Sequence, residues 1–423
     1  MIDNRPLEEV DPEMAALIRK DLERQNTHIH LIASENFASR AVMEATGSVF
    51  TNKYAEGYPN RRYYEGCGVV DEMEELANAR IRDLFGAEYV NVQAHSGAQA
   101  NMGVYFGLIN LGDTVMGMSL DQGGHLTHGS HVNFSGMYYN FVSYGLDRET
   151  ELIDMDEVRR IALESRPKIL LAGYSAYSRH LDYEAFRSIA DEVGAIFMVD
   201  AAHFIGLIAG KAYPNPVPIA DIVTGTTHKA FRGARGGLIM AKEQYGKAID
   251  KGVFPGAQGG SLYNQIAGKA VAFHEAAQPE FQAYAAQVVA NAKAMAATFM
   301  DDGVRVVSGG TDNHLILADL RSVDGELTGK HAATMLDDLG ITMNRNSIPF
   351  DPRPPFVTSG IRMGTPAITT QGMEEADCRA VAGLISRAVH HYQDEDVLSD
   401  VKHEVAALAS KFTPYETDFS GHV

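Results

Sequence analysis

A lysine and an acidic residue lie at the ends of two consecutive predicted strands, where together they could bind a cofactor. Lys229 ends the run TTHK (226–229), and MVDAAH (198–203) places Asp200 and His203 at the end of the strand before it. A buried carboxylate is costly unless a cation or hydrogen-bond donors pair with it. The protonated ring nitrogen of pyridoxal phosphate (PLP) offers both, and the PLP aldehyde can form a Schiff base with a lysine. We therefore predict a PLP site, in which Asp200 strengthens the ring as an acceptor of the electron pair left by a broken bond at Cα.

The segment HSGAQAN (95–101) is typical of a small-residue turn that leads into a helix. Backbone N–H groups at the positive end of that helix, together with Ser96, could hold a phosphate. The same pattern is also typical of an ordinary helix N-cap. Because the chain also has Asp200 and Lys229, we interpret it as the phosphate-binding turn.

Three histidines at spacings of three occur in GGHLTHGSH (123–131), and they support a rival interpretation. His125, His128 and His131 could be the metal ligands of a metal-dependent hydrolase. The neighbouring glycines disfavour a helix, however, and no HExxH-type base is nearby. We expect instead that His125 lies flat on the cofactor ring, that the other two histidines are structural, and that no metal is bound.

The composition excludes several classes of protein. The chain has 423 residues, is 45% hydrophobic and carries a formal net charge of −19 without a run of basic residues, which argues against nucleic-acid binding. Its two cysteines, Cys67 and Cys378, form no CxxC pattern and fit a reducing compartment. Neither a signal peptide nor a membrane-spanning run is apparent, so we expect a cytoplasmic protein without a membrane partner.

From residue 88 to about residue 242, short β-rich runs alternate with amphipathic stretches, which is typical of βα units around a mostly parallel sheet. The seven predicted strands are 89–93, 113–118, 140–145, 168–177, 195–203, 221–229 and 236–241. Helical spacing of apolar residues predicts helices at 98–109, 154–165 and 183–193. We expect an α/β fold whose ligands bind beyond the carboxyl ends of the strands.

The pattern changes after about residue 275, where a long helical stretch precedes short strands and further helices. A chain of this length exceeds what one hydrophobic core usually supports. We therefore expect an N-terminal helical arm (1–30), a large PLP-binding α/β domain (31–276) and a small C-terminal α+β domain (277–423).

With these pieces in order, the chain resembles the serine hydroxymethyltransferase family of fold-type I PLP enzymes across nearly its whole length. The matching segments are LIASENFAS (31–39), TNKYAEGYP (51–59), RRYY (61–64), VQAHSGAQAN (92–101), GGHLTHGS (123–130), SAYS (175–178), YPNPVP (213–218), TTHK (226–229), RGGLI (235–239), VFPGAQGG (253–260), SGGTDNHL (308–315), LTGK (327–330) and PFVTSGIRMGTPA (355–367). The resemblance implies a seven-stranded, mostly parallel sheet between helices. It also implies transfer of the serine hydroxymethyl group to tetrahydrofolate, which leaves glycine and 5,10-methylenetetrahydrofolate.

The resemblance also implies a role for individual residues at the cofactor. Lys229 is similar to the family's Schiff-base lysine, Asp200 to the partner of the pyridine nitrogen, and His125 to the group that stacks on the ring. Further positions similar to the family's cofactor-binding residues are Ser96, Gly97, Ser175, His203 and Thr226. Tyr54, Gly259 and Gly260 are similar to residues that the family brings to the phosphate from a second subunit, so the resemblance implies a homodimer, or a tetramer, with shared active sites.

The amino-acid substrate and the folate have their own implied residues. Arg362 looks like the fork of donors that holds the substrate α-carboxylate, a task that suits arginine better than lysine. Ser34 and Tyr64 assist it, and Glu56 resembles the group that exchanges a proton near the substrate hydroxyl. The positions similar to folate-binding residues are Glu56, Tyr63, Leu120, Gly124, Leu126 and Asn346.

Several residues near the lysine depart from the family pattern. Small residues stand at Ala201, Gly225 and Ala230, whereas Phe204 and Phe350 are larger than usual. The lost volume could open room beside the substrate Cα, so an α-substituted serine is an alternative substrate, with α-methyl-L-serine giving D-alanine. Unchanged specificity for serine is the other possibility.

A catalytically silent relative is an alternative of another class. The chain keeps Lys229, Asp200, Arg362 and Glu56 together, which a silent protein has no need to do. We therefore expect an active transferase.

Overall fold

The computed structural model describes residues 2–416, and its centre is a seven-stranded sheet. In sheet order the strands are β4 (Tyr89–Asn91), β10 (Gly237–Ala241), β9 (Ile222–Thr226), β8 (Ile196–Asp200), β7 (Ile169–Gly173), β5 (Thr114–Met118) and β6 (Asn140–Tyr144). All of them run parallel except β10, which pairs antiparallel with both β4 and β9. The predicted mostly parallel sheet of seven strands is confirmed.

Successive residues of the central strands face two separate hydrophobic layers. In β7, Leu170 and Ala172 pack in the layer on one face, and Ile169 and Leu171 pack in the layer on the other. A strand that is buried on both faces needs apolar residues at every position, which is why β7 reads ILLAG without polar alternation.

Helices cover both layers of the sheet. They are α4 (Gly68–Phe85), α5 (Gly97–Leu108), α6 (Phe134–Tyr138), α7 (Met155–Ser165), α8 (Tyr183–Val193), α9 (Ile205–Ala209), α10 (Glu243–Lys251) and α11 (Tyr263–Ala276). Asp154 and Asp182 precede α7 and α8, and their carboxylates accept hydrogen bonds from backbone N–H groups of the first turn. The predicted helices at 98–109, 154–165 and 183–193 are confirmed within about two residues.

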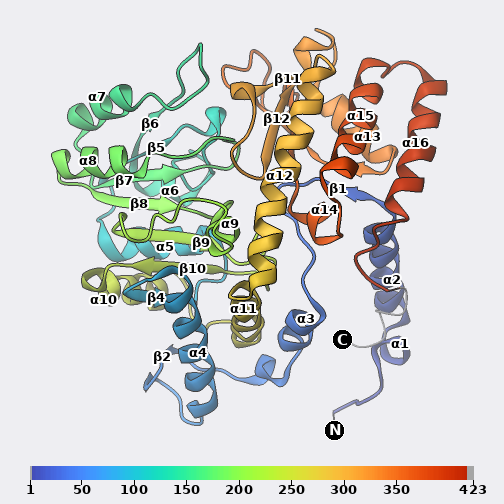
Figure 1. The fold of residues 1–423 in the computed structure, drawn as a ribbon. Coiled ribbons are helices and arrows are strands. Elements are labelled where there is room, and N and C mark those ends of the chain that lie inside the picture. The colour runs from blue at the N-terminus through green and yellow to red at the C-terminus, as the bar shows by residue number, and fades with distance from the viewer. Residues whose placement is uncertain (1, 417–423) are drawn as a thin grey trace.

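A second, antiparallel sheet lies toward the C-terminus. Its order is β11 (Arg305–Val306), β12 (Leu315–Asp319), β15 (Gly360–Gly364) and β14 (Asn344–Asn346). The helices of this region are α12 (Pro279–Asp301), α13 (Gly329–Asp338), α14 (Pro366–Thr370), α15 (Glu375–His390) and α16 (Glu395–Ala409). This region has its own hydrophobic cluster, to which Phe299, Ile316 and Leu336 belong. The long helix α12, gold in Figure 1, runs between the large sheet and the C-terminal elements.

The N-terminal elements join both regions. They are α1 (Leu7–Val10), α2 (Pro12–Thr27), β1 (Ile29–His30), α3 (Arg40–Thr46), β2 (Gly57–Tyr58) and β3 (Arg61–Arg62). Strand β1 pairs parallel with β13 (Ile341–Thr342), so the chain touches the C-terminal region before it enters the large sheet. Short 3-10 helices occupy Val49–Asn52, Leu120–Gln122, Val307–Gly309 and Leu320–Ser322, and a π-helix occupies Gly252–Ala257. The domain boundaries after residues 30 and 276 stay predictions.

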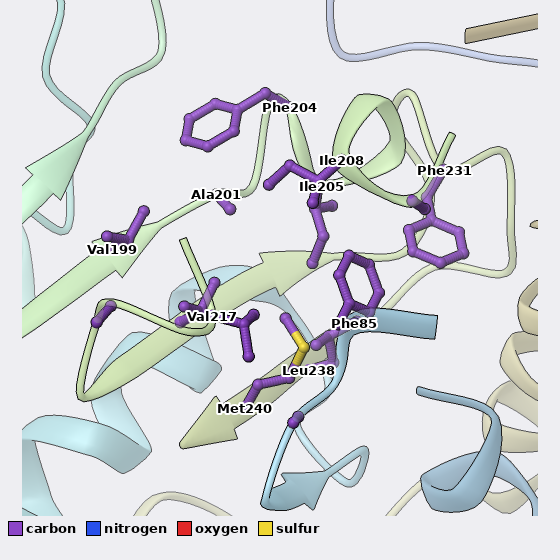
Figure 2. Packing of buried hydrophobic residues seen from close by; sticks show 14 of the residues in the cluster. Phe85, Val199, Ala201, Phe204, Ile205, Ile208, Val217, Phe231, Leu238 and Met240 are labelled. Carbon is purple, nitrogen blue, oxygen red and sulfur yellow. The ribbon is translucent and has the colours of Figure 1, made fainter. Parts of the chain in front are cut away.

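The small residues near the lysine lie in a closed core. A Cβ atom on Gly225 would lie 2.3 Å from Cδ1 of Ile205, so the isoleucine fills the volume that glycine leaves. Phe204 packs on Tyr174 and Tyr213, with ring centroids 4.9 and 4.8 Å away. Figure 2 shows Phe204 and Ile205 pointing in different directions from the beginning of α9.

Ala201 and Ala230 belong to the same buried cluster as Phe204 and Ile205, and both are at most 1% exposed. The expectation that small residues open a space beside the substrate is therefore wrong at Gly225. Within this buried cluster the large side chain of Ile205 fills the space beside the small residue Gly225.

Within residues 2–416 we find no helix that is long and apolar enough to cross a membrane.

Candidate active site

Asp200 is the last residue of β8, and it is held by donors on several sides. The residue is 5% exposed. Its Oδ2 accepts hydrogen bonds from Asn101 Nδ2 at 2.9 Å and from His128 Nε2 at 3.0 Å, and its Oδ1 accepts one from the backbone of Ala202. Burial alone would raise the pKa of this carboxyl, but the hydrogen bonds from His128 and Asn101 lower it well below its usual value. The group is therefore an anion, and its remaining lone pairs suit an N–H donor from a bound ring.

A layer of polar side chains fixes the orientation of this carboxylate. Asn101, on α5, donates to Thr127 Oγ1 and accepts from Thr224 Oγ1 at 2.7 Å. His128 Nδ1 accepts from the backbone N–H of His125, so Nε2 carries the proton that bonds to Asp200. Asn101 was not among the predicted site residues. It lies one helical turn after Gly97, a position that places its side chain over the strand ends.

Lys229 follows β9 at the same edge of the sheet and is 8% exposed. Burial lowers the pKa of its amine to about 8, and the charges of Arg362 and Arg235 act in the same direction against the opposing effect of Asp200. The backbone carbonyl of Lys229 accepts a hydrogen bond from Asn36 Nδ2 at 3.0 Å. A fixed backbone and a depressed pKa make this lysine a good nucleophile near neutral pH.

Neutral imidazoles surround the lysine. Burial lowers the pKa of His125 to about 4, and its Nδ1 lies 2.8 Å from Thr127 Oγ1. His203 stacks on His314 at a centroid distance of 5.6 Å, and burial lowers the pKa of His314 to about 3 and that of His203 well below its usual value. Imidazoles without charge suit a site that binds an aromatic ring. His314, which the sequence argument also missed, lies in the quoted segment SGGTDNHL.

Arg362, on β15, is a guanidinium without an ion pair in the described part of the chain. Its Nη1 donates to the carbonyl of Ser175 at 2.7 Å, and its Nε donates to Asn344 Oδ1 at 3.1 Å. Burial lowers its pKa to about 10. Because a buried cation is costly without an anion, the free donors of Arg362 fit a carboxylate.

Ser96 caps α5 in the turn that we predict to bind the phosphate. Ser96 Oγ accepts from the N–H of Gln99 at 3.1 Å. A Cβ atom on Gly97 would lie 2.6 Å from Cγ2 of Thr226, so only glycine fits where the turn approaches β9. The beginning of α5 and the end of β9 thus bring Ser96, Gly97 and Thr226 together, and their role as a phosphate cradle stays a prediction.

These residues fit PLP, and one buried atom supports the fit independently. Ser175 Oγ is buried and has no hydrogen-bond partner in residues 2–416. Burying a hydroxyl without a partner is costly, so a ligand atom at this point would satisfy it. Asp200 would hold the ring nitrogen, Lys229 the aldehyde carbon, and the turn at Ser96 the phosphate.

The structure does not assemble the predicted alternative metal site. His131 is exposed and does not belong to the group formed by His125, His128 and Asp200, whose ligand atoms lie within 4.8 Å of one another. Within that group both nitrogens of His128 already make hydrogen bonds. The hydrogen bonds hold a carboxylate in place and leave His128 no lone pair for a metal ion.

Glu56 lies in a second cluster, at the surface. Tyr54 donates a hydrogen bond to Glu56 Oε1 at 3.1 Å, and Tyr64 donates to Oε2 at 3.5 Å. A Cβ atom on Gly259 would lie 3.3 Å from Glu56 Oε1, and one on Gly260 would lie 3.2 Å from Tyr54 Cζ. Tyr54 is 57% exposed. Within residues 2–416 these five residues, the outer cluster, form no hydrogen bond with the inner cluster of Asp200, Asn101, His128, Lys229 and Arg362.

The residues implied for folate differ in exposure, and Gly124 is buried. Leu120, Leu126 and Tyr63 are exposed, and the ring of Tyr63 lies 5.8 Å from that of Phe254. Gly124 has a structural reason to be glycine, because a Cβ atom there would lie 2.1 Å from the carbonyl oxygen of Met118. Asn346 lies on β14 and donates to the carbonyl of Ser347.

Ser34 is partly buried, and the residue before it packs on β15, where a Cβ atom on Gly364 would meet Ala33 Cα at 2.6 Å. Its side chain therefore lies close to the strand that carries Arg362. The roles of these residues in binding substrate and folate stay predictions.

The fold and the inner cluster define a fold-type I PLP-dependent transferase. The family model of serine hydroxymethyltransferase matches residues 7–385. A serine hydroxymethyltransferase of Myxococcus xanthus (strain DK1622) is 57% identical over 411 residues, which cover 97% of this chain and 98% of the relative. The chain belongs to the serine hydroxymethyltransferase family, whose members use PLP as cofactor and tetrahydrofolate as co-substrate.

Proposed function

We propose that this protein transfers the hydroxymethyl group of serine to tetrahydrofolate and releases glycine and 5,10-methylenetetrahydrofolate. The observation that carries the proposal is Arg362, an arginine without a carboxylate partner in residues 2–416 that binds the carbonyl of Ser175 beside the inner cluster. An α-amino acid offers the carboxylate that this arginine lacks, and it places its amino group toward Lys229.

When bound, PLP supplies an electron-accepting ring that weakens the bonds at the substrate Cα. Asp200 keeps the proton on the ring nitrogen because its carboxyl stays ionised. Lys229 would hold the cofactor through its aldehyde carbon. Arg362 orients the substrate through its carboxylate, and the neutral imidazole of His203 accepts or donates a hydrogen bond without adding charge.

We assign Glu56 to the proton that moves at the substrate hydroxyl. The distribution of the residues favours a dimer in which the outer cluster of one chain completes the inner cluster of the other. The exposed apolar and aromatic side chains that belong to the outer cluster or lie close to it in the sequence are Val49, Tyr54, Tyr63, Tyr64, Val69 and Leu262. A second chain would cover them.

Serine is the substrate that we propose. The alternative, α-methyl-L-serine, depended on space at Ala201, Gly225 and Ala230, and at Gly225 the side chain of Ile205 occupies that space. The cytoplasmic location stays a prediction from composition.

The test is turnover of the purified protein with tetrahydrofolate and either L-serine or α-methyl-L-serine. We expect a yellow protein with a strong preference for serine, and no turnover by Lys229→Ala. Lys247→Ala, which removes an exposed lysine outside the site, is the matched control. A colourless protein, or a yellow one that turns over neither amino acid, would refute the proposed function.

A further inference from the structure

Lys269 is a buried lysine on α11 that the proposed mechanism does not use. It is 1% exposed. Its Nζ donates to three backbone carbonyls, those of Val92 at 2.8 Å, Ala94 at 3.0 Å and Gly237 at 3.1 Å. An ammonium group has three N–H donors, so the carbonyls satisfy all of them. No carboxylate lies within ion-pair distance of it in residues 2–416.

The three carbonyls belong to the segments that form the phosphate turn. Val92 and Ala94 lie between the end of β4 and Ser96, and the carbonyl of Ala94 also accepts from the N–H of Gly237 at 3.0 Å. Gly237 begins β10, the strand beside β4. Lys269 therefore fixes the backbone immediately before the turn to the strand next to it.

Two glycines separate the ammonium from the turn. A Cβ atom on Gly236 would lie 2.0 Å from Cε of Lys269, whereas one on Gly237 would lie 2.3 Å from the carbonyl oxygen of Ser96. A side chain at Gly236 would occupy the place of the Lys269 side chain, and a side chain at Gly237 would collide with the backbone of Ser96. Because both positions are glycine, the Lys269 ammonium can approach the backbone just before the turn at Ser96. It approaches from the side opposite the predicted phosphate site.

This charge lacks an anion in the chain itself. Glu74 is the acidic residue that acts on it electrostatically, but Glu74 forms an ion pair with Arg62 at 2.7 Å and accepts from Gln93 at 2.8 Å. Burial lowers the pKa of Lys269 to about 7, against the opposing effect of Glu74. A phosphate at the turn would supply the missing negative charge at short range in a medium of low dielectric.

We propose that Lys269 is a positioning residue for the cofactor phosphate: it orients the turn at Ser96 through the three carbonyls and balances the phosphate charge from behind. The inference rests on the proposed function, since it needs a cofactor with a phosphate. The proposed role of Lys269 is to help bind the phosphate group of the cofactor, and it does not involve the chemistry at Lys229.

The experiment compares two ligands of the apoenzyme, PLP and pyridoxal, which lacks the phosphate. We expect Lys269→Met to weaken PLP by about tenfold more than pyridoxal, because only PLP carries the charge that Lys269 balances. Lys269→Gln keeps donors for the carbonyls without the charge, so it separates the two parts of the role. Lys247→Met removes an exposed charge of the same kind and should change neither affinity.

Equal weakening of both ligands would make the role merely structural and overturn the proposal, as would unchanged affinities. Failure of both variants to fold would also overturn it, because Lys269 would then serve the core alone. If the wild-type protein itself bound no PLP, the proposed function would fail. A change in the affinity of the variants for PLP or pyridoxal tests the role of Lys269 only.

Discussion

The inner and outer clusters differ in how completely one chain satisfies them. Asp200, in the inner cluster, is buried and receives hydrogen bonds from Asn101, His128 and the backbone. Within residues 2–416 the carboxylate of Glu56, in the outer cluster, receives hydrogen bonds only from Tyr54 and Tyr64, which are both exposed. The inner cluster is built by the packing of one chain, whereas the outer cluster offers its acid and its aromatic rings to something outside that chain.

This difference suggests a division of tasks. A carboxylate that must stay ionised benefits from a closed shell of donors, because the shell stabilises the charge. A carboxylate that must exchange a proton with a substrate benefits from an exposed position that becomes enclosed only when two chains form a dimer. An active site shared between two chains would combine an enclosed carboxylate with an accessible one.

The sharpest test of the comparison mixes two inactive variants, Lys229→Ala and Glu56→Gln. If Lys229 and Glu56 of different chains form each site, a mixed dimer contains one intact site, and random mixing should restore about a quarter of the wild-type activity. The measurement is turnover after the two proteins are unfolded and refolded together. Activity no greater than that of the separate variants would place both residues in the same chain's site and break the comparison.

Asp200→Asn tests the inner cluster alone. We expect PLP to remain attached to Lys229, while turnover falls by about 10²–10³-fold, because the amide cannot stabilise the ring-nitrogen charge. Absorbance and steady-state kinetics measure the two effects separately. Loss of cofactor together with turnover would mean that Asp200 serves binding instead.

The pKa of Lys229 predicts how the inner cluster responds to pH. Because burial lowers this pKa to about 8, the neutral amine increases with pH and is nearly complete above it. The rate at which PLP attaches to the apoenzyme should therefore rise about tenfold between about pH 7 and about pH 9 and then level off. Stopped-flow absorbance measures this rate. A rate that still rose steeply above pH 10 would indicate an unperturbed lysine.

The smallest expected effect concerns the core beneath the inner cluster. Gly225→Ala should destabilise the protein by about 1–3 kcal/mol through overpacking against Ile205. Adding Ile205→Val should recover part of this loss, since the two residues share one volume. Thermal unfolding of the single and double variants measures the coupling. Additive effects would mean that Gly225 and Ile205 do not compensate each other.

Much of the fold followed from patterns in the sequence. The strands ILLAG and IFMVD are apolar at nearly every position, which is typical of strands buried on both faces, and they fall where they were predicted. Lys229 and Asp200 were found because each follows such a strand. Asn101 and His314 were missed, since a single asparagine or histidine has no pattern that distinguishes a ligand from an ordinary buried side chain.

The substitutions near Lys229 show the limit of the sequence in another way. Ala201 and Gly225 indicated lost volume, but only the packing shows that Ile205 fills the space at Gly225. Volume is a property of neighbours that are distant in the chain, so a sequence cannot say whether a small residue leaves a cavity.

The sequence by itself determined the chemical groups of this protein and their order: an amine, an acid, a phosphate turn and a guanidinium at the ends of predicted strands or in matching motifs. Only the tertiary structure decided which of these groups share an environment. It buried Lys229 and Asp200, left Glu56 only partly buried and placed the Lys269 ammonium on the backbone before the turn at Ser96. The physical reason is that charge and proton affinity depend on burial and on near neighbours, and these are set by contacts between segments far apart in the chain.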